Sequence, residues 1–111
     1  MPDYYDIREY LADDGRCPFA EWLEGLRDRK ARARIDARLA RARLGNLGDY
    51  ASVGDGVYEL RIFYGPGYRV YFGFESDTVV LLLCGGAKSS QRRDIAVAKD
   101  YWNDYRNRDD G

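Results

Sequence analysis

The segment GVYELRIFYGPGYRVYF, residues 56–72, contains two runs of alternating side chains joined by Gly-Pro-Gly. Alternation with a period of two is typical of a half-buried β-strand, and a short glycine-containing connection is typical of a hairpin. Large apolar side chains occupy one parity, which predicts the face toward the core: Tyr58, Leu60, Ile62, Tyr64, Tyr68, Val70 and Phe72. The opposite parity combines charged and aromatic side chains: Glu59, Arg61, Phe63, Arg69 and Tyr71.

Helical patterns lie on both sides of this hairpin. Residues 18–26 and 28–44 have apolar side chains at helical spacing, and Gly45 predicts a left-handed cap after the second helix. Further along the chain, Ser89 or Ser90 is a candidate N-terminal cap. The helix that follows is expected to carry its apolar side chains on one face: Ile95, Ala98, Trp102 and Tyr105.

Two more segments predict strands. Residues 4–11 predict a first strand, and residues 78–84 are apolar on both parities. A strand of the second kind is covered on both faces, so we expect it to be central, and the glycines of residues 85–90 are expected to end it. The order β-α-α-β-β-β-α predicts one α+β domain over residues 1–111, with a small antiparallel sheet and helices packed on one face.

The composition excludes several classes of protein. With 45% hydrophobic and 33% charged residues, the 111 residues suit one globular domain. The sequence shows neither a secretory leader nor a membrane-spanning run, so we expect a cytoplasmic protein. Cys17 and Cys84 are far apart, which favours reduced thiols or core side chains over a disulfide. The chain has no histidine, which excludes Ser-His-Asp and Cys-His catalysis and the usual zinc sites.

The net charge of -1 conceals an uneven distribution of charge. Residues 27–43 contain eight basic residues and two acidic ones, so this segment carries a charge of +6. Two interpretations remain open. The arginines form either a solvated helix surface or an electrostatic footprint for a nucleic acid or an acidic protein partner.

The second parity of the hairpin brings two arginines together. A connection made by Gly-Pro-Gly alone would place Phe63 opposite Arg69 and Arg61 opposite Tyr71. In this register the two guanidiniums are diagonal neighbours on one face, within reach of a common anion. Glu59 lies one step along the same face, where its carboxylate could hold an arginine in place.

This face has two interpretations as well. Polar side chains are the norm where an antiparallel sheet meets solvent. Alternatively, Arg61 and Arg69 form a phosphate site, which Lys88 can reach because it follows the neighbouring strand. Phe63 and Tyr71 favour the second interpretation, because proteins bind single-stranded RNA with rings that stack on bases and guanidiniums that pair with phosphates.

Three stretches of the sequence carry a resemblance to a known family. They are FAEWLEGLRDRKARARIDARLARARLGNLGD, GVYELRIFYGPGYRVYF and LLLCGGAKSSQRRDI. Together they resemble the addiction-module killer proteins, which are phage-derived, HigB-like toxins of the RelE/ParE superfamily in type II toxin–antitoxin systems. The resemblance covers roughly residues 4–105, and it implies a RelE-like fold.

The resemblance also implies a function. Many relatives enter the ribosomal A site and cut messenger RNA without a metal or a small-molecule cofactor, through attack of a ribose 2′-OH on the adjacent phosphate. The expected partners are a cognate antitoxin, usually a helix-turn-helix protein, together with the ribosome and its message. Arg61 and Arg69 match the basic sheet positions of the RelE-like nucleases, and Lys88 matches the basic residue after the last strand.

The sequence departs from the family pattern at three positions. Ile95 stands where the RelE-like enzymes carry a tyrosine as candidate base, Ser89 replaces a second basic residue, and Glu59 replaces a lysine. Tyr71, Tyr68 and Glu59 are the alternatives for the missing proton acceptor. The candidate catalytic residues are Arg61, Arg69, Lys88 and Tyr71. The candidate substrate-binding residues are Glu59, Phe63, Tyr68, Arg92 and Arg93.

Two alternative functions follow from the same resemblance. The chain could be a non-enzymatic inhibitor of DNA gyrase, as in the ParE branch, and the absence of a tyrosine at position 95 favours this reading. It could also be a degenerate toxin that acts only as an antitoxin-binding co-repressor. Binding to an antitoxin is expected in every case, either over the polar sheet face or at a distance from it.

Overall fold

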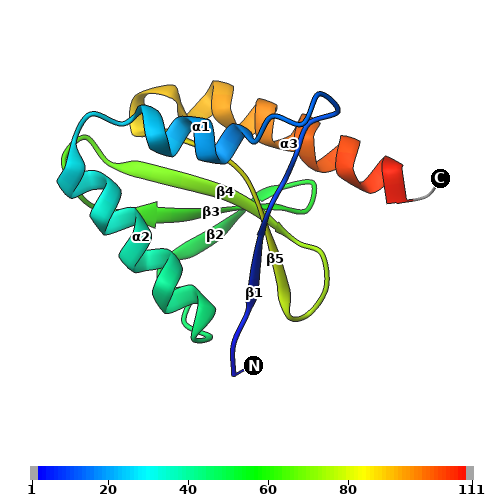
Figure 1. Ribbon diagram of the computed structural model, residues 1–111, viewed down its shortest axis with the longest axis horizontal. Coiled ribbons are helices and arrows are strands. Elements are labelled where there is room, and N and C mark those ends of the chain that lie inside the picture. Colours follow the sequence, from blue (N-terminus) through cyan, green and yellow to red (C-terminus); the bar gives the residue numbers. More distant parts are fainter. Residues whose placement is uncertain (1–2, 110–111) are drawn as a thin grey trace.

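The computed structural model describes residues 3–109 as an α+β fold with one mixed sheet (Figure 1). This confirms the predicted α+β class. The described residues form, in chain order, β1 (Asp6–Glu9), α1 (Pro18–Gly25), α2 (Arg29–Arg43), β2 (Tyr50–Gly54), β3 (Val57–Ile62), β4 (Tyr68–Phe74), β5 (Val79–Ala87), the 3-10 helix η1 (Lys88–Ser90) and α3 (Gln91–Asp109).

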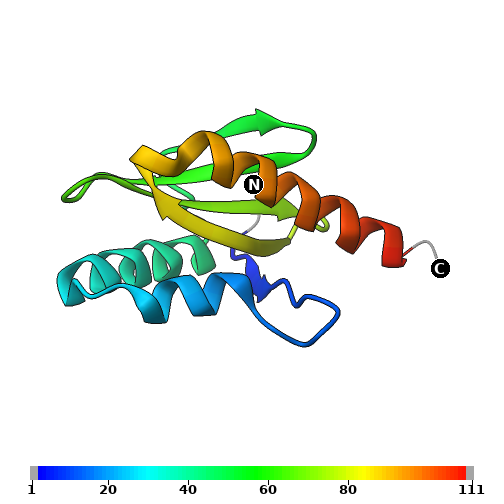
Figure 2. The same ribbon diagram turned by 90° about the horizontal axis from the view of Figure 1, so that it is seen from above.

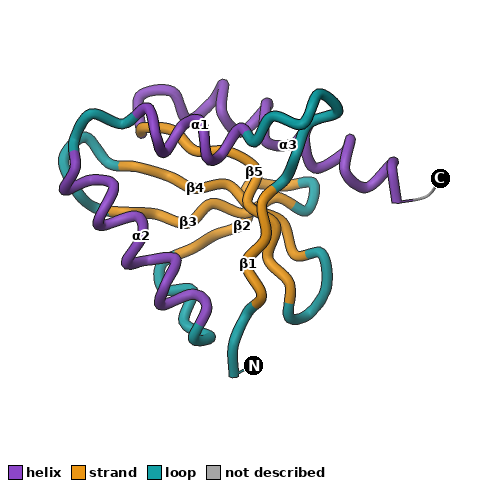
Figure 3. Tube along the Cα trace, viewed as in Figure 1, coloured by secondary structure: helices purple, strands orange, loops and turns teal. Residues whose placement is uncertain are grey.

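The five strands lie in the order β1-β5-β4-β3-β2. Strands β2 to β5 pair antiparallel, whereas β1 pairs parallel with β5, with Asp6 opposite Val79. The prediction of an antiparallel sheet is therefore wrong for β1. Alternation identifies a strand, but its direction depends on the connection, and here α1 and α2 carry the chain from one edge strand to the other (Figure 3).

Helices cover both faces of the sheet. Figure 2 shows α1 and α2 on one side and α3 on the other, so the prediction that the helices pack on one face is wrong. The reason is that the sheet has apolar side chains on both faces, and each needs a cover. Ile35 and Phe72 lie in the core under α1 and α2, and Leu83 and Trp102 lie in the core under α3.

The predicted apolar parity of the hairpin is confirmed. All of its members lie in or against the core under α1 and α2: Tyr58, Leu60, Ile62, Tyr64, Tyr68, Val70 and Phe72. Only part of the opposite parity faces solvent, because α3 covers the rest of this face. Glu59 and Tyr71 are consequently buried, and the interpretation of this face as a simple wet surface is wrong for these two residues.

Strand β5 is central and buried, as predicted, but it continues through the two glycines that were expected to end it. A Cβ atom on Gly85 would lie 2.2 Å from the Trp22 ring of α1. A Cβ atom on Gly86 would lie 1.9 Å from the carboxylate of Asp94 in α3. The glycines therefore allow two helices to approach the same strand closely from opposite faces.

Strand β2 was not predicted from the sequence. It pairs with β3 through a two-residue turn, in which Asp55 and Gly56 have φ angles of 55° and 83°. An Asp-Gly turn with two positive φ angles is a strong signal for a hairpin. The Asp55-Gly56 pair in the sequence is consistent with the observed order β-α-α-β-β-β-β-α.

Helix α2 agrees with the helix predicted over residues 28–44. The Asp28 carboxylate accepts hydrogen bonds from the backbone N–H groups of Lys30 and Ala31, which caps the first turn. Gly45 has a φ angle of 91°, so its left-handed conformation after the helix is confirmed. The buried face of the helix consists of Ala31, Ile35, Leu39 and Ala42.

Helix α3 lies along the sheet with the predicted face inward. Ala98 and Trp102 are buried, and Ile95 and Tyr105 pack against the same core. No helix in the described part of the chain is long and apolar enough to cross a bilayer. Both cysteines are free thiols, Cys84 in this core and Cys17 against the other, which confirms the expectation of unpaired side chains.

Candidate functional site

The register of the β3–β4 hairpin places Arg61 directly opposite Arg69. The predicted diagonal arrangement is wrong, because the connection contains five residues rather than three and the last pair is Ile62 with Tyr68. Within this loop the backbone N–H of Gly67 donates to the carbonyl of Tyr64 at 2.9 Å. The longer turn shifts every pairing by two residues and places the two arginines directly opposite each other instead of on a diagonal.

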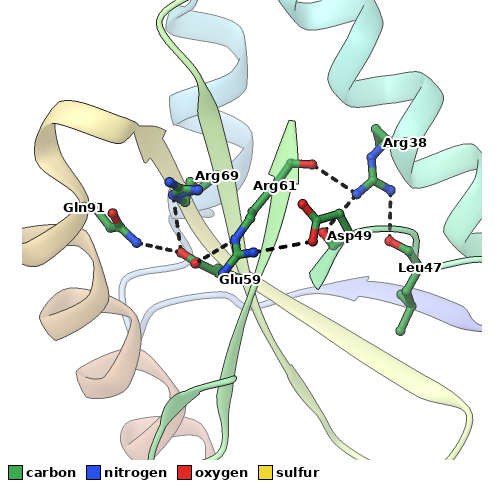
Figure 4. A network of polar contacts seen from close by, with 7 residues as sticks. All are labelled: Arg38, Leu47, Asp49, Glu59, Arg61, Arg69 and Gln91. Atoms are coloured by element: carbon green, nitrogen blue, oxygen red, sulfur yellow. Dashed lines mark hydrogen bonds and ion pairs between the residues drawn. The ribbon is translucent and has the colours of Figure 1, made fainter. Parts of the chain in front are cut away.

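Glu59 holds this arginine pair from below. Its carboxylate is buried, at 3% exposure, and accepts a hydrogen bond from Arg61 Nε at 3.1 Å. The other carboxylate oxygen lies 3.4 Å from Arg69 Nε and accepts a hydrogen bond from Gln91 Nε2 at 3.0 Å (Figure 4). Gln91 is the first residue of α3, so this one carboxylate joins two strands and a helix.

The electrostatics of the pair follow from this arrangement. Like charges placed opposite each other on a sheet repel, and a buried carboxylate must be paired, so Glu59 compensates both costs. The side chains of Arg61 and Arg69 remain 34% and 13% exposed. Arg61 Nη1 lies 3.5 Å from a carboxylate oxygen of Asp49. Because Glu59 faces both Nε atoms and Asp49 lies near Nη1 of Arg61, the other Nη atoms are the donors that a ligand would meet.

Arg61, Arg69 and Lys88 line one pocket of about 310 Å³, which we term the hairpin pocket. The backbone N–H of Lys88 donates to the carbonyl of Gly67 at 2.9 Å, which fixes η1 beside the hairpin loop. The remaining lining comes from residues 62–68. Among the described residues that line the pocket, three are basic and none is acidic, so the hairpin pocket is suited to an anion.

The two candidate tyrosines differ in their access to the hairpin pocket. Tyr68 lines it, although its ring is largely buried. Tyr71 is 0% exposed, and its hydroxyl has no hydrogen-bond partner among residues 3–109. Burial, together with the nearby carboxylates of Glu59 and Asp94, raises the pKa of Tyr71 well above its ordinary value. The structure therefore places Tyr71 beneath the site, where a substrate does not reach it.

The other candidate residues also differ in whether they reach the hairpin pocket. Phe63 is 78% exposed and lines the hairpin pocket. Arg92 and Arg93 are exposed on the first turn of α3 and are not brought to the pocket, and Arg93 Nε lies 4.0 Å from the Asp94 carboxylate. Ile95 packs against the core under α3. The structure thus gathers the cations of the hairpin and η1 but leaves those of α3 outside.

A second pocket, which was not predicted from the sequence, adjoins the hairpin pocket. This helix pocket, of about 420 Å³, is lined by residues of α2, of the loop between α2 and β2, and of the end of β3 with the residue after it: Arg34, Ala37, Arg38, Arg41, Gly48, Asp49, Arg61, Ile62 and Phe63. Residues 61–63 line both pockets. The available signal was the spacing of Arg34, Arg38 and Arg41, which places three guanidiniums on one helix face.

Arg38 has a structural task within the helix pocket. Its guanidinium donates to the carbonyls of Leu47, Asp49 and Arg61, at 2.9, 3.2 and 3.1 Å (Figure 4). Burial, followed by the charge of Arg41, lowers the pKa of Arg38 from its ordinary value. The hydrogen bond to Arg61 attaches the end of β3 to α2 and so fixes the wall that the two pockets share, and the other two attach the loop before β2.

The fold and the pockets define an α+β protein with a cationic pocket at the end of a β-hairpin, whose described lining contains no acidic residue. No family model matches the sequence. An uncharacterized protein from Haemophilus influenzae is 51% identical over 81 residues, which cover 73% of this chain and 82% of the relative. The chain belongs to the same family as that protein.

Proposed function

We propose that this protein is the toxin of a type II toxin–antitoxin module with a RelE-like fold, and that it cleaves messenger RNA on the ribosome. The observation that carries the proposal is the convergence of Arg61, Arg69 and Lys88 on one pocket without an acidic lining residue among those described. Such a pocket binds a phosphodiester through charge-assisted hydrogen bonds. The family resemblance of the sequence supports the same conclusion.

The proposed reaction is an intramolecular phosphoryl transfer. The ribose 2′-oxygen forms a bond to the adjacent phosphorus, the bond from phosphorus to the 5′-oxygen of the next nucleotide breaks, and a 2′,3′-cyclic phosphate remains. Arg61 and Arg69 stabilise the charge that develops on the non-bridging oxygens, since fixed cations act most strongly where charge appears in the transition state. Lys88, which is exposed, donates a proton to the leaving 5′-oxygen.

The proton of the attacking hydroxyl needs an acceptor on the pocket wall. Glu59 is engaged through both oxygens and lies below the arginines. Tyr64 and Tyr68 line the hairpin pocket and are the remaining candidates. In this proposal most of the rate enhancement comes from cation placement, and general base catalysis contributes less.

The proposal is tested with translating ribosomes programmed with a defined message, by primer extension across the message. We expect codon-periodic cleavage by the unaltered protein and loss of cleavage in the Arg61→Ala/Arg69→Ala variant. Because that variant leaves the buried Glu59 carboxylate without a cation, Lys88→Ala serves as a second test at an exposed position. Arg29→Ala/Arg43→Ala removes two cations outside both pockets and is the control. Undiminished cleavage by the double variant and by Lys88→Ala would refute the proposal.

A second candidate function rests on a specific observation. Tyr71 is sealed below the pocket and Ile95 packs into the core, so neither residue can act as the general base at the phosphate. This favours a non-enzymatic ParE-like inhibitor of DNA gyrase. Trapped gyrase–DNA complexes and an SOS response in expressing cells, with intact messages, would establish that function. A chain that does not impair growth would instead be a degenerate toxin with a co-repressor role.

The proposed partners follow from the proposed function. A cognate antitoxin, of the helix-turn-helix type in the HigB-like branch, keeps the toxin silent, and the ribosome with its message is the target in the cytoplasm. Co-expression with the gene adjacent to this one, followed by purification of a stable complex, identifies the antitoxin.

A further inference from the structure

Phe63 occupies an unusual place between the two pockets. Its side chain is 78% exposed, although it follows directly on the buried end of β3. It lines the hairpin pocket on one side and the helix pocket on the other. A large aromatic side chain held in solvent between two cationic pockets gains nothing from burial in the free protein.

The backbone on both sides of Phe63 is fixed. The Arg38 guanidinium binds the carbonyl of Arg61, and the N–H of Tyr64 donates to the carbonyl of Ile62 at 3.1 Å. The guanidinium of Arg34 lies 5.1 Å from the centre of the Tyr64 ring, which ties the loop to α2. The ring of Phe63 is therefore presented from a rigid base, and little entropy is lost when a planar ligand stacks on it.

The charges on either side of the ring complete the arrangement. In the helix pocket Arg34 and Arg41 are exposed, whereas Arg38 is committed to backbone carbonyls. The one acidic residue in the described lining, Asp49, already contacts Arg61. Cations therefore flank the ring on both sides.

We propose that Phe63 is a base-stacking platform for single-stranded RNA, with one backbone phosphate in the hairpin pocket and a neighbouring phosphate beside Arg34 and Arg41 in the helix pocket. This inference rests on the proposed function and names the path of its substrate. In a single strand the base lies between successive phosphates, which matches the order cation, ring, cation. A duplex keeps its bases stacked and does not offer one to the ring. An acidic peptide would satisfy the cations but supplies no planar group at the required place.

The test is a binding cycle with short fluorescent single-stranded RNA, measured by anisotropy at low salt. One internal nucleotide at a time is replaced by an abasic residue. We expect one abasic position to weaken binding to the unaltered protein by about 5- to 100-fold, the range typical of one base stacked on an aromatic ring. In Phe63→Ala binding is weaker to begin with, and the same abasic residue has no further effect. Leu44→Ala, at an equally exposed apolar residue outside both pockets, is the control and retains the full abasic effect.

The salt dependence of binding tests the second phosphate. Each phosphate contact with a single strand contributes about 0.7 to the slope of log affinity against log salt. Arg34→Ala/Arg41→Ala should lower that slope by at least one such contact, whereas Arg29→Ala/Arg43→Ala removes the same charge from the same helix and should change the slope less. Equal changes in the two variants would overturn the role of the helix pocket.

The remaining results are equally decisive. Absence of RNA binding by the unaltered protein, an abasic effect that persists in Phe63→Ala, or tighter binding to a polyglutamate peptide overturns the inference. A deoxyribose strand distinguishes RNA from single-stranded DNA as the ligand. The proposed function fails separately, because cleavage on ribosomes is measured independently. If the abasic effect depends on Phe63 but no cleavage occurs, the stacking platform is supported and the nuclease is rejected. If cleavage occurs and is unchanged in Phe63→Ala, the nuclease is supported and the stacking platform is rejected.

Discussion

Arg61 stands directly opposite Arg69 across β3 and β4, and one buried carboxylate, that of Glu59, contacts both. Two guanidiniums in this position repel each other, and the carboxylate beneath them makes the arrangement stable without entering the pocket. The cationic character of the pocket and the stability of the hairpin therefore depend on the same residue.

The first prediction concerns Glu59. Replacement by Gln keeps the shape but removes the charge that two arginines share, and we expect the free energy of unfolding to fall by about 1–3 kcal/mol, the range for hydrogen bonds to charged groups. Urea denaturation measures the change. Asp49→Asn is the matched control, since Asp49 contacts Arg61 at a solvent-exposed site, and its effect should stay below about 1 kcal/mol. Equal losses in the two variants would contradict the assigned role of Glu59.

The second prediction concerns Tyr71. Its buried hydroxyl has no partner among the described residues, so Tyr71→Phe removes a polar group that contributes little to stability. We expect the free energy of unfolding to be unchanged or increased, because an unsatisfied buried hydroxyl is costly. Cleavage on ribosomes should be retained. Loss of cleavage in a folded Tyr71→Phe protein would instead make Tyr71 the proton acceptor that the sequence suggested.

The third prediction concerns the glycines of β5. Gly86→Ala places a methyl group against the Asp94 carboxylate, and overpacking of this kind costs about 1–3 kcal/mol. Thermal unfolding should show a clear decrease in the midpoint. Gly25→Ala at the end of α1 is the control, because a Cβ there has no atom within 4 Å, and it should be neutral or slightly stabilising. A harmless Gly86→Ala would mean that β5 and α3 are further apart than described.

The fourth prediction concerns thiol reactivity. Burial, with a smaller contribution from Asp94, raises the pKa of Cys84 to about 12, so its reactive thiolate is scarce at mildly alkaline pH. Cys17 is only half-buried. In the native protein, iodoacetamide should label Cys17 well before Cys84, as followed by mass spectrometry of peptides, and both should react in urea. Rapid native labelling of Cys84 would show that the core under α3 opens readily.

The sequence was informative where local chemistry decides the structure. Asp28, whose carboxylate caps α2, and the left-handed Gly45 mark the two ends of this helix, which lie close to the predicted ones. A run that is apolar on both parities identified β5 as central. The strand β2 was also within reach, because Asp55-Gly56 is a local hairpin signal. These features depend on residues a few positions apart.

Part of the remainder depends on contacts that are distant in the sequence. Glu59 is buried because α3, which begins at Gln91, covers it, and the sequence of the hairpin does not indicate this cover. The register of Arg61 and Arg69 is a local feature, but it depends on the length of the hairpin loop, which has five residues instead of the three that Gly-Pro-Gly indicated. The sequence therefore indicated which side chains form the candidate site but not their depth or pairing.

The adjacent glycines at the end of β5 have a consequence for communication across the molecule. Where Gly85 and Gly86 lie, Trp22 from one layer and Asp94 from the other approach the same stretch of main chain. At this point only the main chain of β5 separates the helices that cover the two faces of the sheet. A change in the position of Trp22 or of Asp94 would therefore act on the same main-chain segment, two residues before Lys88, although neither side chain lines the hairpin pocket.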